Sequence, residues 1–262
     1  MRENAIRKKL VSDQAALGSW LSIADALSAE VMAAVGWDWL LIDMQHGPIP
    51  FEAAGAMVTA VRACGATPFV RPAWNESSQI QRALDLGAHG IIVPVVNTAH
   101  DALAVVSDAY FPPLGERSRG GVRAPLAFAT DGNTYRERAN DEILVFVQIE
   151  TDEAVENAAA IAAVDGIDGL FVGPNDLAAS SRKRWPDDVW NRDAAYMETI
   201  ASIPRHAASA GKKAGILARD PAMARETIAM GYRLIGIAAD VTFLLSAASA
   251  ALESMRGAAV AS

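Results

Sequence analysis

The sequence "WLLIDMQHGP", residues 39–48, combines a strand suited to burial with a polar end. Residues 39–42 form an apolar run of the kind found in strands that are covered on both faces. Asp43, Gln45 and His46 follow at once, and a glycine and a proline then end the regular structure. Two interpretations are open at this point: an ordinary strand end with turn residues, or the polar edge of an active site.

Similar apolar runs, bounded by glycine or proline, recur along the 262 residues of the chain. Eight of them are predicted strands, at 17–22, 39–43, 67–71, 90–96, 143–150, 169–173, 213–217 and 234–239. Stretches of helical character separate them, at 24–34, 51–63, 76–86, 98–108, 152–163, 193–210 and 220–230. This alternation predicts an α/β protein with the (β/α)8 TIM-barrel fold.

A doubly wound α/β sheet is the alternative architecture. Its phosphate-binding fingerprint, G-x-G-x-x-G after the first strand, is missing, because the chain has "LGSWLS" at 17–22. No linker or low-complexity tract divides the chain, so we expect a single barrel domain over residues 1–262. Two insertions, roughly 110–142 and 178–192, are predicted to be long loops, where barrels commonly build their specificity.

Polar side chains gather where the predicted strands end. They are Asp43, His46, Arg71, Gln148, Glu150, Asn175, Asp176 and Asp240. In a (β/α)8 barrel the carboxyl ends of the strands meet at one rim, and that rim carries the active site. The polar end of the strand at 39–43 is therefore interpreted as part of an active site.

Glu150 and Asp176 follow neighbouring strands, so their carboxylates can converge on one cation. Two carboxylates completed by water and substrate oxygens suit Mg²⁺ or Mn²⁺. The structural alternatives are an acid at a helix start for Glu150 and an N-cap for Asp176. The sequence thus predicts a metal site without excluding these alternatives.

Arg71 and His46 supply the other groups that carbonyl chemistry needs. A guanidinium suits a carboxylate or a developing enolate oxygen, and a neutral imidazole is a good general base. None of the five lysines lies on the carboxyl half of a predicted strand, so a Schiff-base mechanism has no candidate amine. A metal, an arginine and a histidine base together would stabilise an enolate formed beside a 2-oxo acid.

Composition excludes several other classes of protein. The net charge of −8 argues against nucleic acid or an anionic membrane as a partner. No secretory signal and no apolar run of 18 residues is present, so we expect no membrane span. Cys64 is the only cysteine, which fits the cytoplasm, and we expect it to be a core residue.

Five segments in order resemble the HpcH/HpaI aldolase family of class II, metal-dependent pyruvate aldolases. They are "DMQHGP" (43–48), "PFVRPAWN" (68–75), "LDLGAHGIIVP" (84–94), "VFVQIET" (145–151) and "GLFVGPNDLA" (169–178). The likeness extends from about Gly18 to Leu245, and the order and spacing of the five segments make it specific. It implies a TIM barrel that cleaves 4-hydroxy-2-oxo acids reversibly to pyruvate, or a close 2-oxo acid such as hydroxypyruvate, and an aldehyde.

The resemblance also implies roles for individual residues. His46 would accept the proton, Arg71 would stabilise the enolate, and Glu150 and Asp176 would hold Mg²⁺, Mn²⁺ or Co²⁺. The substrate contacts would be Gln148, the backbone of Gly173, Pro174 and Asn175, and an acceptor pocket that includes Trp20 and Leu217. Asp85 matches the acid that raises the basicity of the histidine in the family, and Asp43, three residues from His46, is a competing candidate.

Two positions depart from the pattern of the family. Relatives often have Glu where Gln45 stands, which removes a charge beside the base, and Ala where Asn175 stands. The loop "PPLGERSRGG" (112–121), with Arg117, Arg119 and the nearby Arg123, is predicted either to meet the acceptor aldehyde or to be a solvated basic loop. An oxaloacetate decarboxylase with the same enolate chemistry, and a non-catalytic barrel that binds an anionic metabolite, are the alternative functions.

The segment "VTFLLSAASAALESM" (241–255) predicts a final helix with apolar residues spread more widely than one buried stripe. Burial of the surplus against another subunit would stabilise an oligomer. The resemblance implies a homohexamer in which C-terminal helices are exchanged between partners.

Overall fold

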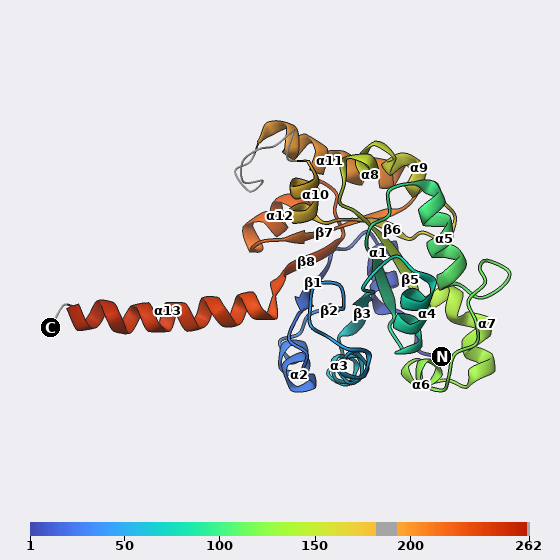
Figure 1. Cartoon of the computed structure of the whole chain (residues 1–262), viewed down its shortest axis with the longest axis horizontal. Helices are drawn as coiled ribbons and strands as arrows, with labels where there is room; N and C mark the ends of the chain where they lie inside the picture. Colours follow the sequence, from blue (N-terminus) through green and yellow to red (C-terminus); the bar gives the residue numbers. More distant parts are fainter. Residues whose placement is uncertain (182–192, 261–262) are drawn as a thin grey trace.

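The computed structural model describes residues 1–181 and 193–260. Eight parallel strands close into a barrel in chain order, with helices around it, as Figure 1 shows. The predicted (β/α)8 architecture is confirmed. The strands are β1 (Ala16–Leu21), β2 (Trp39–Asp43), β3 (Thr67–Arg71), β4 (Gly90–Val93), β5 (Leu144–Ile149), β6 (Gly169–Val172), β7 (Lys213–Ala218) and β8 (Leu234–Ala239).

Helices precede and follow the strands, and most of them lie on the outside of the barrel. They are α1 (Ala5–Val11), α2 (Ala26–Ala34), α3 (Phe51–Ala63), α4 (Ser77–Asp85), α5 (Ala99–Ala109), α6 (Arg123–Ala127), α7 (Gly132–Glu142), α8 (Asp152–Glu156), α9 (Ala158–Ala162), α10 (Pro174–Ser180), α11 (Ala194–Ser209), α12 (Pro221–Ala229) and α13 (Asp240–Val260). Most of the apolar core lies between these helices and the outer face of the sheet.

Large aromatic rings fill the inside of the barrel, each beside a glycine of the neighbouring strand. The pairs within the described residues are Trp39 with Gly18, Phe69 with Gly90, Phe146 with Gly169, Phe171 with Gly215, and Trp20 with Gly236. A Cβ atom at any of these glycines would overlap the ring. The barrel is therefore a packed core rather than a pore, and the rings form a floor beneath its carboxyl-terminal rim.

The short helix α1, which the sequence did not predict, closes the opposite end of the barrel. Ile6 and Leu10 pack with the inward-facing residues of the strands. Asn4 caps the helix by accepting from the amides of Ile6 and Arg7, and its side chain donates to the backbone oxygens of His89 and Glu142. Because the first ten residues are mostly polar and basic, the sequence did not indicate that Ile6 and Leu10 face the inside of the barrel.

One insertion, one predicted helix and one cysteine differ from the predictions made from the sequence. The insertion at 110–142 contains the helices α6 and α7, and most of the insertion predicted at 178–192 lies outside the described residues. The helix predicted at 152–163 is divided at Asn157 into α8 and α9. The prediction that Cys64 is a core residue is wrong: it is exposed, because the apolar face of α3 ends one turn earlier at Val61.

The last helix, α13, leaves the barrel and extends away from it, as the red helix in Figure 1 shows. Residues 241–256 are all exposed, and one ring contact, 6.3 Å between the centroids of Phe243 and Trp37, lies near its start. The predicted helix is thus present, but it covers little of its own barrel. Within the part of the chain that the structure describes, no helix has the length and hydropathy of a membrane span.

The ring-and-glycine packing predicts the effect of one added methyl group. Gly90→Ala should lower the free energy of unfolding by about 1–3 kcal/mol, since the added Cβ would lie 2.3 Å from the buried Phe69 ring. Urea denaturation measures the change. Gly132→Ala on α7 is the control, because no atom outside its chain neighbours and its own helix backbone lies within 4 Å of the position that its methyl group would occupy. Equal stability of the two variants would contradict this account of the core.

Candidate active site

A pocket lies at the rim formed by the carboxyl ends of the strands. Its lining residues are Trp20, His46, Arg71, Gln148, Phe171, Gly173, Pro174, Asn175, Asp176 and Leu217. All of these except Phe171 were predicted as site residues from the sequence. Phe171 reaches the pocket because it faces inward on β6, opposite Gly215 of β7.

A buried ion pair joins the ends of β2 and β3. The guanidinium of Arg71 donates from Nε to Oδ1 of Asp43 at 2.9 Å and from Nη2 to Oδ2 at 2.7 Å. These two bonds make the pair bidentate. Both side chains are buried, so the pair is hidden from water. Oδ1 of Asp43 also accepts from the backbone amides of Gln45 and His46, at 3.1 and 3.3 Å. Asp43 therefore fixes both the arginine and the turn that carries His46.

From Arg71 a chain of hydrogen bonds continues to Glu150. Nη1 of Arg71 donates to Oε1 of Gln148 at 3.3 Å, and Nε2 of Gln148 donates to Oε2 of Glu150. The other carboxylate oxygen of Glu150 accepts from the backbone amide of Val95 at 2.7 Å. Gly173 leaves room for this chain, since a Cβ there would lie 2.5 Å from Nε2 of Gln148.

Glu150 and Asp176 provide a donor set that fits a divalent cation. Burial raises the pKa of the Glu150 carboxyl; the Val95 amide opposes this rise, and the charge of Asp176 adds to it. A divalent cation between Glu150 and Asp176 would offset the unfavourable charge of Asp176 beside the buried Glu150 carboxylate. Within the described residues no group of three or more histidine, cysteine or acidic side chains is gathered for a metal, so other ligands would be water or substrate.

His46 lies at the outer edge of the pocket and is exposed in the single chain. Within the described residues its imidazole makes no hydrogen bond, because Asp43 reaches only its backbone amide. Neither acid suggested as its partner is therefore hydrogen-bonded to the ring within the described residues of one chain. The other three histidines lie outside the pocket, and His89 is buried, with its ring stacked on Phe128 at 3.9 Å between centroids.

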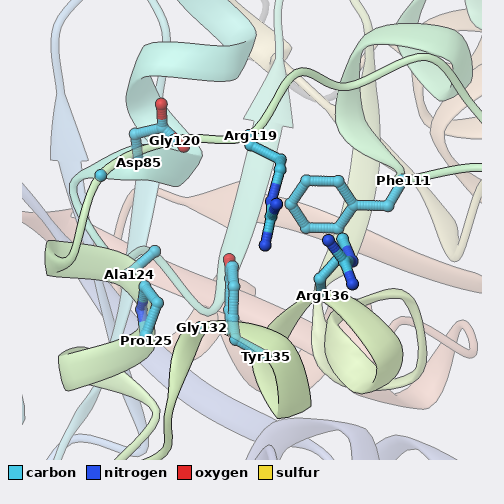
Figure 2. A pocket seen from close by; sticks show the side chains of 10 residues that line it. Asp85, Phe111, Arg119, Gly120, Ala124, Pro125, Gly132, Tyr135 and Arg136 are labelled. Atoms are coloured by element: carbon cyan, nitrogen blue, oxygen red, sulfur yellow. The ribbon is translucent and has the colours of Figure 1, made fainter.

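Asp85 belongs to a second pocket, shown in Figure 2, which does not include His46. It is the last residue of α4, which runs back toward the start of β4, and its carboxylate accepts from Nη2 of Arg117 at 2.8 Å. Figure 2 shows the side chains of Arg119 and Tyr135 directed toward the middle of this pocket. The structure does not bring Asp85 to the predicted base within one chain.

The arginines of the predicted basic loop divide into two kinds. Arg117 is buried between Asp85 and the ring of Phe111, and Arg123 donates to backbone and side-chain oxygens of α3. These two hold the loop in place. Arg119 is exposed, and among the described residues its side chain donates only to Asn133, at 3.3 Å. The interpretation as a solvated basic loop thus fits Arg119 alone.

Two further residues near the rim have structural contacts. Asp240, one of the polar strand ends, accepts from the backbone amides of Ser22 and Ile23 and so holds the segment after β1. Val95 was missed by the sequence reasoning because it acts through its backbone amide, which no residue pattern reveals.

The sequence profile described as HpcH/HpaI aldolase/citrate lyase matches residues 16–247, which include every element of this rim. The chain belongs to this family. It is 38% identical to the 2-keto-3-deoxy-L-rhamnonate aldolase of Klebsiella pneumoniae over 90% of this chain and 87% of that protein. It is 37% identical to the hydroxypyruvate/pyruvate aldolase of Sagittula stellata over 95% of this chain and 96% of that one.

A solved structure of the same family is also similar to the whole chain. The HpcH/HpaI aldolase/citrate lyase family protein of Burkholderia cenocepacia superposes with a TM-score of 0.87 at 35% identity, covering 97% of this chain and 99% of that one. The likeness therefore includes the barrel, the rim and the segments that connect them.

The buried ion pair predicts a large penalty for neutralising its acid. Asp43→Asn should lower the free energy of unfolding by about 3 kcal/mol, because Arg71 would be left buried with an uncompensated charge. Asp13→Asn is the matched control: Asp13 also pairs with two cations, but its side chain is 60% exposed, so about 1 kcal/mol at most should be lost. Chemical denaturation of the two variants compares them, and equal losses would contradict the role of burial.

Proposed function

We propose that the chain is a metal-dependent aldolase that cleaves 4-hydroxy-2-oxo acids reversibly to pyruvate, or a close 2-oxo acid, and an aldehyde. Family membership supports a carbon–carbon lyase. The observation that carries the assignment is the placement of Arg71, Gln148 and Asp176 around one pocket, with Glu150 bonded to Gln148. This set suits the formation of an enolate next to a 2-oxo acid.

Glu150 and Asp176 would hold the divalent metal, with Mg²⁺, Mn²⁺ and Co²⁺ as the candidates. The buried Glu150 carboxylate and the charge of Asp176 near it are the support for this role. When bound, the metal would polarise the 2-oxo acid and so acidify the protons on C3. The backbone of Gly173, Pro174 and Asn175 would contact the carboxylate of the substrate, and the amide of Gln148 would help to orient it.

Arg71 would stabilise the negative charge that develops on the 2-oxo oxygen. Two of its nitrogens are held by Asp43, so the guanidinium is fixed before substrate arrives and need not reorganise during the reaction. Asp43 is thus proposed as a positioning residue for Arg71 rather than as the partner of the His46 ring.

His46 would move the proton at the other end of the reaction. In cleavage it would accept the proton of the C4 hydroxyl while the C3–C4 bond breaks, which releases the aldehyde and leaves the electron pair on the enolate. His46 would then give this proton to C3 of the enolate, which forms pyruvate. In the reverse direction His46 would take a proton from C3 of pyruvate and give it to the oxygen that becomes the C4 hydroxyl, so atoms and charge balance.

Trp20 and Leu217 are proposed to contact the aldehyde. Both line the pocket, and Leu217 lies on β7 beside the Trp20 ring and Gly236. An apolar wall of this kind accepts many aldehydes and rejects few, since one methylene changes binding by only about 1–3 kcal/mol. A screen of aldehydes against pyruvate and hydroxypyruvate would identify the acceptor.

Removal of the metal tests the proposed reaction directly. The full chain should release pyruvate from a 4-hydroxy-2-oxo acid, lose that activity after chelation, and regain it when Mg²⁺ or Mn²⁺ is added. A coupled assay with lactate dehydrogenase measures pyruvate. Full activity of the metal-free protein would contradict the proposal, and aldehyde-dependent consumption of pyruvate distinguishes an aldolase from a decarboxylase.

A matched pair of variants separates the base from a residue that merely shapes the pocket. His46→Ala should lower kcat by about 100-fold or more, with little change in the affinity for the 2-oxo acid. His100→Ala is the control, because His100 is exposed on α5 and lies outside the pocket. Wild-type kcat in His46→Ala across pH would show that another group is the base.

The C-terminal helix supports the proposal that the active protein is a homohexamer with exchanged helices. Leu244, Leu245, Leu252 and Met255 have exposed fractions of 62%, 67%, 51% and 70%. Apolar side chains on a helix that leaves its own barrel are stabilised when another subunit covers them, by about 25 cal/mol per Å².

Light scattering at micromolar concentration tests the assembly. Six chains of 27.7 kDa predict a mass of about 166 kDa. Replacing Leu245 and Leu252 with Glu should shift the mass downward, whereas Val11→Glu, another exposed apolar position, should leave it unchanged. A wild-type mass near that of one chain would exclude the hexamer.

A further inference from the structure

Val95, in the segment between β4 and α5, has a backbone conformation that its side chain disfavours. Its φ is 57°, in the left-handed region. A β-branched residue there is a true outlier, and such strain costs about 1–3 kcal/mol. The other non-glycine residues with positive φ within the described chain are Asp13, Ala129 and Ala238, none of which is branched at Cβ. Strain of this kind persists only where neighbouring contacts hold it.

The neighbouring contacts come mainly from Asn97. Its Oδ1 accepts from the hydroxyl of Thr151 at 2.6 Å, and its backbone oxygen accepts from Nδ2 of Asn157 at 2.9 Å. Thr98 then begins α5 with a capping box to Asp101, which anchors the other end of the segment. Thr151 directly follows Glu150 in the sequence. The bonds of Asn97 to Thr151 and Asn157 therefore connect the segment between β4 and α5 to the chain that follows Glu150.

The strained conformation directs the amide of Val95 at Glu150. The hydrogen bond from this amide to Oε1 of Glu150 is 2.7 Å long. Within the described residues no other backbone amide donates to this carboxylate. A donor held at this distance fixes the orientation of the Glu150 carboxylate, as groups that hydrogen-bond to a metal ligand do. The position of this amide depends on φ of Val95, and therefore on the Asn97 contacts.

We propose that residues 95–98 form a positioning loop for Glu150, in which the contacts of Asn97 hold Val95 in the left-handed conformation and the Val95 amide fixes the carboxylate for a divalent metal. The inference rests on the proposed function in one respect, that Glu150 is a metal ligand. It adds a role for Val95 and Asn97, neither of which lines the pocket.

Loss of the Asn97 side chain should release the loop. Without the bond to Thr151, Val95 is free to relax to negative φ, and its amide turns away from Glu150. Loss of a group that orients a metal ligand typically weakens metal binding about 10- to 100-fold. Glycine adopts positive φ without strain. In Val95→Gly the backbone at position 95 therefore no longer gains energy by changing to negative φ, and its N–H group can still donate to Glu150.

The experiment is a calorimetric titration of Mn²⁺ into the metal-free full-length chain. Asn97→Ala should bind Mn²⁺ about 10-fold or more weakly than wild type, and the double variant Asn97→Ala/Val95→Gly should recover most of the lost affinity. Ala129→Gly is the matched control, because it relieves positive φ of 50° in the turn after α6, far along the chain from the site, and should not change Mn²⁺ affinity. A merely structural role of Asn97 would give no recovery in the double variant.

Thermal unfolding by circular dichroism accompanies each titration, and Asn97→Ser replaces Asn97→Ala if the latter does not fold. Wild-type affinity in the folded Asn97 variant, or a double variant as weak as the single one, would overturn the inference while the proposed function stands. Absence of Mn²⁺ binding by the wild-type chain would overturn the proposed function, and this inference with it.

Discussion

A large aromatic ring fits inside this closed barrel where a neighbouring strand leaves space for it. Each ring inside this barrel lies beside a glycine of a neighbouring strand, and four of these pairs are also direct register partners in the sheet, such as Phe69 with Gly90. This packing determines how far the filled core extends along the barrel axis. Above it, the same inward-facing positions are free to carry polar groups.

Every second side chain of a strand points into the barrel, and this spacing connects the aromatic core to the polar rim above it. On β3, Phe69 fills the core and Arg71, two residues later, faces the pocket; on β5, Phe146 is followed in the same way by Gln148. Successive inward positions thus pass from apolar to polar within one strand. The buried Asp43–Arg71 pair stands at this boundary, where low dielectric strengthens the attraction and the floor of rings excludes water from below.

This regularity explains what could be predicted from the sequence. The eight strands and the polar strand ends follow from local patterns, and most of the residues they indicated line one pocket. The helix α1 was missed because only Ile6 and Leu10 of its seven residues face the core. Contacts between distant segments depend on backbone geometry and leave no mark in a single sequence. Examples are the hydrogen bonds of Val95 to Glu150, of Arg117 to Asp85 and of Arg71 to Asp43. The roles given to the site residues stay predictions.

The exposure of Cys64 has a practical consequence. It is the only thiol in the chain, and it follows α3 at the point where the chain turns back toward the start of β3, at the end of the barrel opposite the pocket. A fluorescent or spin label attached through a maleimide would therefore have a single, defined position on the chain. Such a label would report rotational diffusion, and distances between chains in the proposed hexamer, without any need to engineer a cysteine.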